Sequence, residues 1–283
     1  PYTTLFRSVL PLNYPPCDTT IDILYAVSFS VKYKFDKIII MKNFDILKKI
    51  YERLSNEVDE MKFSLPVVSV YNPLNYAHEG FEKYLRYSEG KKRVVFLGMN
   101  PGPWGMAQTG VPFGEVEAVK NFLGIKDLMI VPPQNENPLY PVKGLGCKRS
   151  EVSGKRLWGF FQEQYKTAEK FFAEHFVLNY CPLLFLAESE KNRVRNFTPD
   201  KIKKEEREKL FAYCDLCLKN VIEVFEPEYV VGIGNFAEQR AKISLEGMNL
   251  KVIKILHPSP ASPQSNKNWG EKALEQLKIY DCL

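Results

Sequence analysis

Three polar side chains in this sequence stand at the ends of short apolar runs, where they could act on a bound molecule. Asn100 follows the run 93–98, Asn179 lies near the end of the run 176–180, and His257 follows the run 251–256. An amide offers a hydrogen-bond donor and an acceptor together, so it can bind the edge of a planar base. A histidine can donate a hydrogen bond to a carbonyl oxygen that gains negative charge. These residue types predict a pocket for a uracil-like base and for its leaving anion.

The segment 98–115, GMNPGPWGMAQTGVPFGE, is rich in glycine and proline and contains Asn100. Such a loop lets the backbone approach a ligand closely without flexing. Phe113, near its end, could stack on a base. Prolines remove the N–H donors that a phosphate cradle uses, and neither a Walker pattern nor a G-x-G-x-x-G pattern occurs here. The sequence of this segment therefore argues against a nucleotide-phosphate loop.

Other kinds of chemistry find little support. The three histidines, His78, His175 and His257, are far apart with no paired metal-ligand spacing, so we expect neither a metal nor a cofactor. Cys214 and Cys217 form a C-x-x-C pair that could bind metal or act in redox chemistry. However, the spacing 210, 214, 217, 221, 225 marks one face of a helix, which favours core packing and suits a reducing compartment.

Four short runs rich in Val, Ile, Leu and Phe, at 93–98, 176–180, 229–234 and 251–256, predict strands buried on both faces of a parallel sheet. Helical patterns lie around them, at 44–61, 153–175, 205–225, 235–246 and 268–280. The alternation predicts an α/β fold, a three-layer α/β/α sandwich with a central four-stranded parallel sheet. Ligands bind such sheets at the carboxyl ends of the strands, where Asn100, Asn179 and His257 stand.

The chain has 283 residues and a net charge of +5, which permits a nucleic-acid partner without demanding one. No apolar run reaches the ~20 residues of a membrane span. Residues 1–8 read like a translated sequencing adapter, and the first methionine is Met41. We expect residues 1–40 to be a non-native or disordered extension and 41–283 to be one domain; the alternative is a genuine but fragmentary N-terminus.

Several blocks of this sequence resemble the family of single-strand-selective monofunctional uracil-DNA glycosylases. Residues 98–115 and 257–269 are similar to its two active-site motifs, and 71–77, 150–161 and 179–187 are similar to further blocks. The likeness runs from about Tyr71 to the C-terminus. It implies a DNA repair enzyme that flips a base out of the strand and hydrolyses its N-glycosidic bond, which initiates base excision repair, with no lyase activity.

The resemblance implies roles for the residues of these motifs. Asn100 would position the attacking water, and His257 would hydrogen-bond uracil O2 and stabilise the departing anion. Asn179 would read the O4 and N3–H edge, and Phe113 would stack on the base. The Met99 backbone would add a contact. Gly102 would leave space near C5, so that 5-hydroxymethyluracil and 5-formyluracil also fit. An Asn at the water position implies an oxocarbenium-like route in which the sugar cation forms first.

DNA is the implied partner, single- or double-stranded, bound by a monomer in the nucleus. The basic segment 189–209 and the wedge 259–268 would contact it, through Ser189, Lys191, Arg193, Arg195, Asn196, Thr198, Lys201, Ser259, Pro260, Ala261, Gln264, Asn266 and Lys267. Ala261 replaces an Arg common in the family, which weakens the wedge. Two alternatives stay open: a mismatch-specific glycosylase of the same superfamily, and a non-catalytic nucleic-acid-binding module on the same fold.

Overall fold

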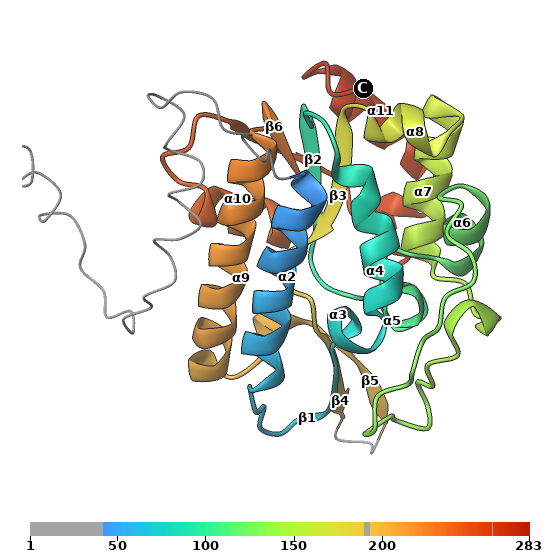
Figure 1. Cartoon of the computed structure of the whole chain (residues 1–283), viewed down its shortest axis with the longest axis vertical. Coiled ribbons are helices and arrows are strands. Elements are labelled where there is room, and N and C mark those ends of the chain that lie inside the picture. Colours follow the sequence, from blue (N-terminus) through green and yellow to red (C-terminus); the bar gives the residue numbers. More distant parts are fainter. Residues whose placement is uncertain (1–41, 190–192, 262) are drawn as a thin grey trace, which may run out of the picture. The chain divides into compact units, whose positions relative to one another are not determined.

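The computed structural model describes residues 42–189, 193–261 and 263–283, and two sheets organise them (Figure 1). The larger sheet has four parallel strands: β2 (Val94–Gly98), β3 (His175–Asn179), β6 (Tyr229–Ile233) and β7 (Lys251–Ile255). Their order across the sheet is β3-β2-β6-β7. Each coincides with one of the apolar runs, so the predicted four-stranded parallel sheet is confirmed. The proposed extension 1–40 lies outside the described residues, and the domain boundary stays a prediction.

Helices cover this sheet on both faces because the chain reverses its direction across the sheet at β2. From β2 it crosses to β3 on one side, and it then reaches β6 and β7 on the other. Right-handed crossovers in opposite directions place helices on opposite faces. One face carries α2 (Asn43–Asp59), α9 (Lys204–Phe225) and α10 (Asn235–Ser244); the other carries α7 (Val152–Tyr165), α8 (Ala168–Phe172) and α11 (Trp269–Lys278). The three-layer sandwich is confirmed.

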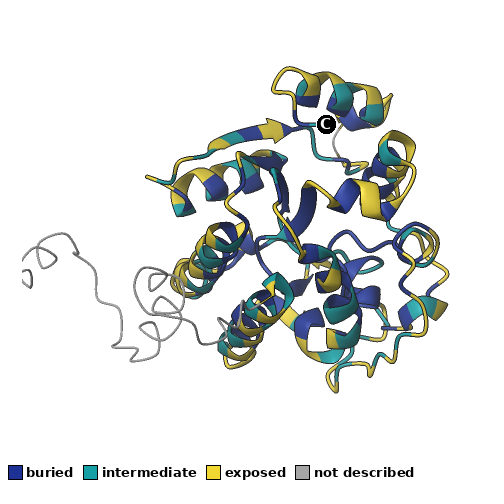
Figure 2. Cartoon of the chain, turned by 45° about the horizontal axis from the view of Figure 1, so that its top comes forward, coloured by how far each residue is buried: buried dark blue, intermediate teal, exposed yellow. Residues whose placement is uncertain are grey.

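Burial follows these layers. Every residue of β2 is buried, whereas the helices turn one side to the sheet and the other to solvent (Figure 2). On α9 the predicted apolar face is buried, Cys214 and Cys217 included, so this pair packs in the core. In the part of the chain that the structure describes, no helix is long and apolar enough to span a membrane.

A second, antiparallel sheet was not expected. It consists of β1 (Val67–Tyr71), β4 (Leu184–Glu188) and β5 (Val194–Phe197), in the order β1-β4-β5. The sequence of β5, VRNF, is half charged or polar and exposed in its middle, so it reads as a loop. Pairing with the buried strand β4 stabilises it as an edge strand. Part of the basic segment 189–209 is therefore a strand, β5, at the edge of this second sheet.

Two further expectations were wrong in detail. The helical pattern 153–175 is split between α7 and α8, because Lys166 adopts φ 68° and the Thr167 hydroxyl caps the new helix at Lys170 N–H. Strand β7 is not buried on both faces: Lys251 and Lys254 are exposed because β7 is an edge strand.

Short elements complete the chain. The helices are α3 (Pro73–Tyr76), α4 (His78–Leu85), α5 (Met106–Thr109) and α6 (Val116–Asn121). The turns of 3₁₀ helix are η1 (Arg86–Ser88), η2 (Gly144–Gly146), η3 (Pro199–Lys201) and η4 (Pro263–Ser265). Helix α5 lies inside the Gly- and Pro-rich loop and shortens it to a compact turn after β2.

Candidate active site at the strand ends

The loops after β2, β3 and β7 line a cavity of ≈ 530 Å³, which we call the strand-end cavity. All the residues predicted to contact the base or the reacting atoms line it: Met99, Asn100, Gly102, Phe113, Asn179 and His257. They come from distant parts of the chain. The parallel sheet brings them to one edge because its strands end there together.

Asn100 is held by its amide nitrogen. Its Nδ2 donates to the carbonyl of Leu183 at 3.1 Å, and more weakly to the carbonyl of Pro101 at 3.4 Å. The hydrogen-bonding atom that remains for a ligand is Oδ1, an acceptor. An amide oxygen can orient a water molecule, but it cannot take a proton from it as a carboxylate can.

Asn179 and Phe113 pack against each other at the end of β2. A Cβ added to Gly98 would overlap both side chains, so only glycine allows this approach. Oδ1 of Asn179 is buried and has no hydrogen-bond partner among the described residues, while Nδ2 donates to the sulfur of Met106 at 3.2 Å. A buried acceptor without a partner costs about 1–3 kcal/mol. A base with an N–H at this point would recover that free energy.

Phe113 adds backbone strain to the same wall. Its φ is 54°, in the left-handed region that bulky residues avoid, yet the side chain is only 7% exposed. Such conformations cost on the order of 1–3 kcal/mol and gather at binding sites. The ring centroid lies 6.3 Å from that of His257, so one aromatic and one imidazole flank the same space.

His257 is neutral and has a defined tautomer. The Ser259 N–H donates to Nδ1 at 3.0 Å, which leaves the proton on Nε2 as a donor. Burial lowers the pKa of this imidazole to about 4. The Ser265 hydroxyl donates to the His257 carbonyl and fixes the backbone behind it. The cavity therefore holds a neutral N–H donor at physiological pH.

Glu151 also lines the cavity, and sequence reasoning missed it. A Cβ on Gly102 or Gly105 would collide with its carboxyl group. Gly102 is therefore needed for the close approach of Glu151, before any ligand is considered. The other lining residues without a predicted role are Pro101, Pro103, Trp104, Ser150, Val152 and Ser153. The block 150–161 was noted for its family likeness, which is the signal that could have found them.

The predicted DNA contacts divide into two groups. Asn196 and Thr198, from β5 and the turn after it, and Ser259 and Pro260, after β7, line the strand-end cavity. The other described ones are not among its lining residues: Ser189, Arg193, Arg195, Lys201, Ala261, Gln264, Asn266 and Lys267. Lys191 lies outside the described residues. Ala261 is exposed, and its N–H donates to the Ser259 hydroxyl at 3.2 Å, so it borders the cavity mouth.

Nothing among the described side chains forms a metal centre. No group of three or more His, Cys, Asp or Glu residues lies together there in a way that could hold a metal ion. His175 is buried between aromatic rings and hydrogen-bonds the Phe171 carbonyl at 3.1 Å, a packing role. The chemistry of the cavity rests on amides, one imidazole, one aromatic ring and one carboxyl group.

Comparisons with known proteins agree with this geometry. The family model of the uracil DNA glycosylase superfamily matches residues 85–278. Proteins named single-strand selective monofunctional uracil-DNA glycosylase are 48% identical over 234 residues: the Rattus norvegicus protein covers 82% of each chain, and the Bos taurus protein covers 82% of this chain and 84% of its own. The chain therefore belongs to the uracil-DNA glycosylase superfamily.

A solved structure supports the fold alone. The crystal structure of Pedobacter heparinus SMUG2 superposes with a TM-score of 0.62 at 16% identity, over 86% of this chain and 98% of its own. The sequence resemblance is thus confirmed by curated relatives, and the fold by a distant structure.

Proposed function

We propose that this protein is a monofunctional uracil-DNA glycosylase, a hydrolase that cuts the N-glycosidic bond of uracil in DNA. One observation carries the proposal. The unpartnered Oδ1 of Asn179 lies beside Phe113 in a cavity that also holds the neutral His257. Uracil offers the matching groups: an N3–H donor, two carbonyl acceptors and a flat ring face. Superfamily membership supports the same activity.

The geometry supports a specific course of reaction. The base stacks on Phe113, N3–H donates to Asn179 Oδ1, and Asn179 Nδ2 exchanges its weak sulfur acceptor for O4. The bond between N1 and the sugar carbon C1′ then breaks, and its electron pair leaves with uracil. His257 Nε2–H donates to O2 and stabilises the anion. Because Asn100 is an amide and not a base, the sugar cation precedes water attack. Water held by Asn100 Oδ1 adds to C1′ and loses its proton to solvent.

Substrate range is part of the proposal. Uracil, 5-hydroxymethyluracil and 5-formyluracil in single- and double-stranded DNA are the substrates, with the target base flipped into the cavity. Asn196, Thr198, Ser259 and Pro260 at the cavity wall would hold the flanking backbone, and the basic residues beyond them would contact phosphates. The enzyme would act as a monomer in the nucleus.

A non-catalytic DNA-binding module on the same fold is the competing hypothesis. It would not need a strained Phe113, a desolvated His257 and an oriented Asn100 on one cavity. Binding alone tolerates loss of any of these, because phosphate contacts supply most of the affinity. The geometry favours the enzyme.

A base-release assay tests the proposal. Single- and double-stranded oligonucleotides carrying one uracil, 5-hydroxymethyluracil or 5-formyluracil would be incubated with the protein, and free base and abasic sites counted. Release of free base with uncut abasic strands supports a monofunctional glycosylase. Binding without base release, by protein that melts cooperatively, would refute it in favour of the binding module.

A further inference from the structure

Two glutamates of this protein, the buried Glu115 and the half-buried Glu151, stand just before helix N-termini but make different contacts. Glu115 precedes α6 and caps it: Oε2 accepts from Ala118 N–H at 2.9 Å and Oε1 from the Ser150 hydroxyl at 2.7 Å. Glu151 precedes α7 and makes no side-chain hydrogen bond to its own helix. Its carboxyl group turns away to Gly102 and Gly105, and Oε2 is buried without a hydrogen-bond partner. A structural cap does not explain Glu151.

Among the described residues, none forms an ion pair with Glu151. The charged group that acts on its pKa is the carboxylate of Glu115, which precedes α6. Arg149 stacks on the face of Trp104 at 3.9 Å, and Arg156 of α7 donates to the Pro258 carbonyl at 2.8 Å. His257, the other titratable side chain lining the cavity, is neutral.

These surroundings set the proton affinity of the carboxyl group. Burial, with the Glu115 charge, raises the pKa of Glu151 to about 7, although the backbone N–H groups of Gly105 and Trp104 oppose the rise. Around neutral pH the group therefore exchanges between an O–H donor and a carboxylate acceptor.

Glu151 lies on a different wall of the strand-end cavity from Asn179. Asn179, Phe113 and His257 lie together around Gly98 and the ends of β2 and β7. Glu151 lies against the turn Gly102–Gly105 of the same cavity. A uracil whose N3, O2 and O4 are bound at the first wall turns its C5–C6 edge away from that wall. C5 is the position of that edge at which natural pyrimidines carry substituents.

We propose that Glu151 is a specificity-determining residue, which hydrogen-bonds a polar substituent at C5 of the flipped base from the Gly102–Gly105 wall. The inference rests on the proposed glycosylase function and deepens it. The protonated carboxyl donates to the carbonyl oxygen of a formyl group. The ionised carboxylate accepts from the hydroxyl of a hydroxymethyl group and repels a formyl oxygen.

Single-turnover excision of 5-formyluracil and 5-hydroxymethyluracil, between pH 5.5 and pH 8.5, tests this assignment. For the unaltered enzyme the ratio of the two rates should fall by about tenfold as pH rises through 7, one hydrogen bond being exchanged for a repulsion. In Glu151→Gln the fall of this ratio across pH 7 should be lost, because an amide donates and accepts at every pH. Comparing the two proteins at each pH cancels the ionisation of the substrates themselves.

Glu115→Gln is the matched control. Removing the neighbouring negative charge lowers the pKa of Glu151, so the fall in the ratio should persist and move to lower pH. This arm keeps the proposal testable if Glu151→Gln fails to melt cooperatively. A flat ratio in the unaltered enzyme, or the same fall in Glu151→Gln, would overturn the inference. Absence of uracil release at every pH would instead refute the proposed glycosylase, so the two failures are distinguishable.

Discussion

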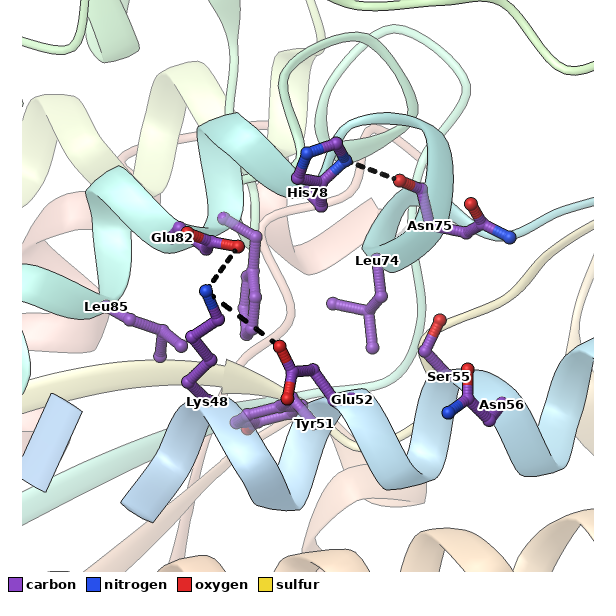
Figure 3. Close-up of a pocket in the computed structure, with 11 residues that line it drawn as sticks. Lys48, Tyr51, Glu52, Ser55, Asn56, Leu74, Asn75, His78, Glu82 and Leu85 are labelled. Atoms are coloured by element: carbon purple, nitrogen blue, oxygen red, sulfur yellow. Dashed lines mark hydrogen bonds and ion pairs between the residues drawn. The ribbon is translucent and has the colours of Figure 1, made fainter. Parts of the chain in front are cut away.

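Two hollows of similar size in this protein differ in what their polar groups do. The strand-end cavity has a volume of ≈ 530 Å³, and the helix groove, between α2 and the helices α3 and α4, has ≈ 420 Å³ (Figure 3). In the groove Lys48 pairs with Glu82 at 3.1 Å and with Glu52 at 3.9 Å, and His78 bonds the Asn75 carbonyl at 2.9 Å. Figure 3 shows two separate sets of contacts, the ion pairs of Lys48 and the hydrogen bond between His78 and Asn75.

The strand-end cavity holds the opposite arrangement. Asn179 Oδ1 and Glu151 Oε2 are buried without partners, and none of the described residues lining the helix groove has such an atom. Phe113 is strained, and His257 is desolvated. Each of these features lowers the free energy of unfolding, and a complementary ligand would give the two unpartnered oxygens the hydrogen bonds they lack. Unmet hydrogen-bonding capacity, more than volume, distinguishes a binding site from a surface groove.

The sharpest test of this difference removes the groups that act on the reacting atoms. His257→Ala or Asn100→Ala should lower the single-turnover rate of uracil excision by at least ~10²-fold, because one donor to developing charge contributes about 3–4 kcal/mol. Binding to uracil-containing DNA, measured by fluorescence anisotropy, should persist. Since the pKa of His257 is about 4, its contribution should not vary between pH 6 and pH 8. Full activity in the doubly substituted protein would contradict the assignment.

The desolvated carboxyl group of Glu151 should cost stability in a pH-dependent way. Its folded-state pKa of about 7 lies above that of an unfolded glutamate, near 4.3. Below both pKa values the Glu151 carboxyl is protonated in the folded and the unfolded protein, so it does not affect the free energy of unfolding. As pH rises toward 7 the unfolded chain ionises first, and the free energy of unfolding falls, by up to about 4 kcal/mol above pH 7.

Glu151→Gln should therefore melt higher than the unaltered protein at pH 8, with a smaller difference at pH 5. Scanning calorimetry at both values measures it. Glu115→Gln is the control, and should melt lower at both values because its carboxylate caps α6 and accepts from Ser150. A Glu151→Gln protein that is destabilised at pH 8 would show that the folded state stabilises the carboxylate, against the raised pKa.

The sequence reveals the catalytic half of the site better than the half containing Glu151. Asn100, Asn179 and His257 follow apolar runs, and buried parallel strands have a local pattern that places their ends together. Glu151 reads as an ordinary acid before a helix. Its unusual state comes from contact with Gly102 and Gly105, far along the chain, and no periodicity records such a contact. Strand β5 was not predicted for the same reason: its pairing with β4 stabilises it, and its own sequence does not have the pattern of a strand.

A smaller effect is expected at the mouth of the strand-end cavity. Ala261 is exposed beside Ser259 and Pro260, and too short to fill the gap left by a flipped base. Ala261→Arg should raise single-turnover excision from a U·A duplex several-fold, since one added contact contributes on the order of 1 kcal/mol. Excision from a single strand, which needs no unpairing, should change by less than about threefold. An equal change on both substrates would show that residue 261 does not reach the base stack.

The smallest effect is expected in the helix groove. Lys48 has a side chain about one-third exposed, as does Glu82, and ion pairs of this kind contribute about 0–1 kcal/mol. Lys48→Met keeps an aliphatic side chain in the groove that Tyr51 and Leu85 also line, and removes the charge. It should therefore change the free energy of unfolding by less than about 1 kcal/mol and uracil excision by less than about twofold, because no unpaired group is created at the strand ends. Urea unfolding and single-turnover assays on one preparation measure both. A tenfold loss of excision at unchanged stability would show that a groove whose hydrogen bonds are satisfied still acts on the site, and the distinction between the two hollows would fail.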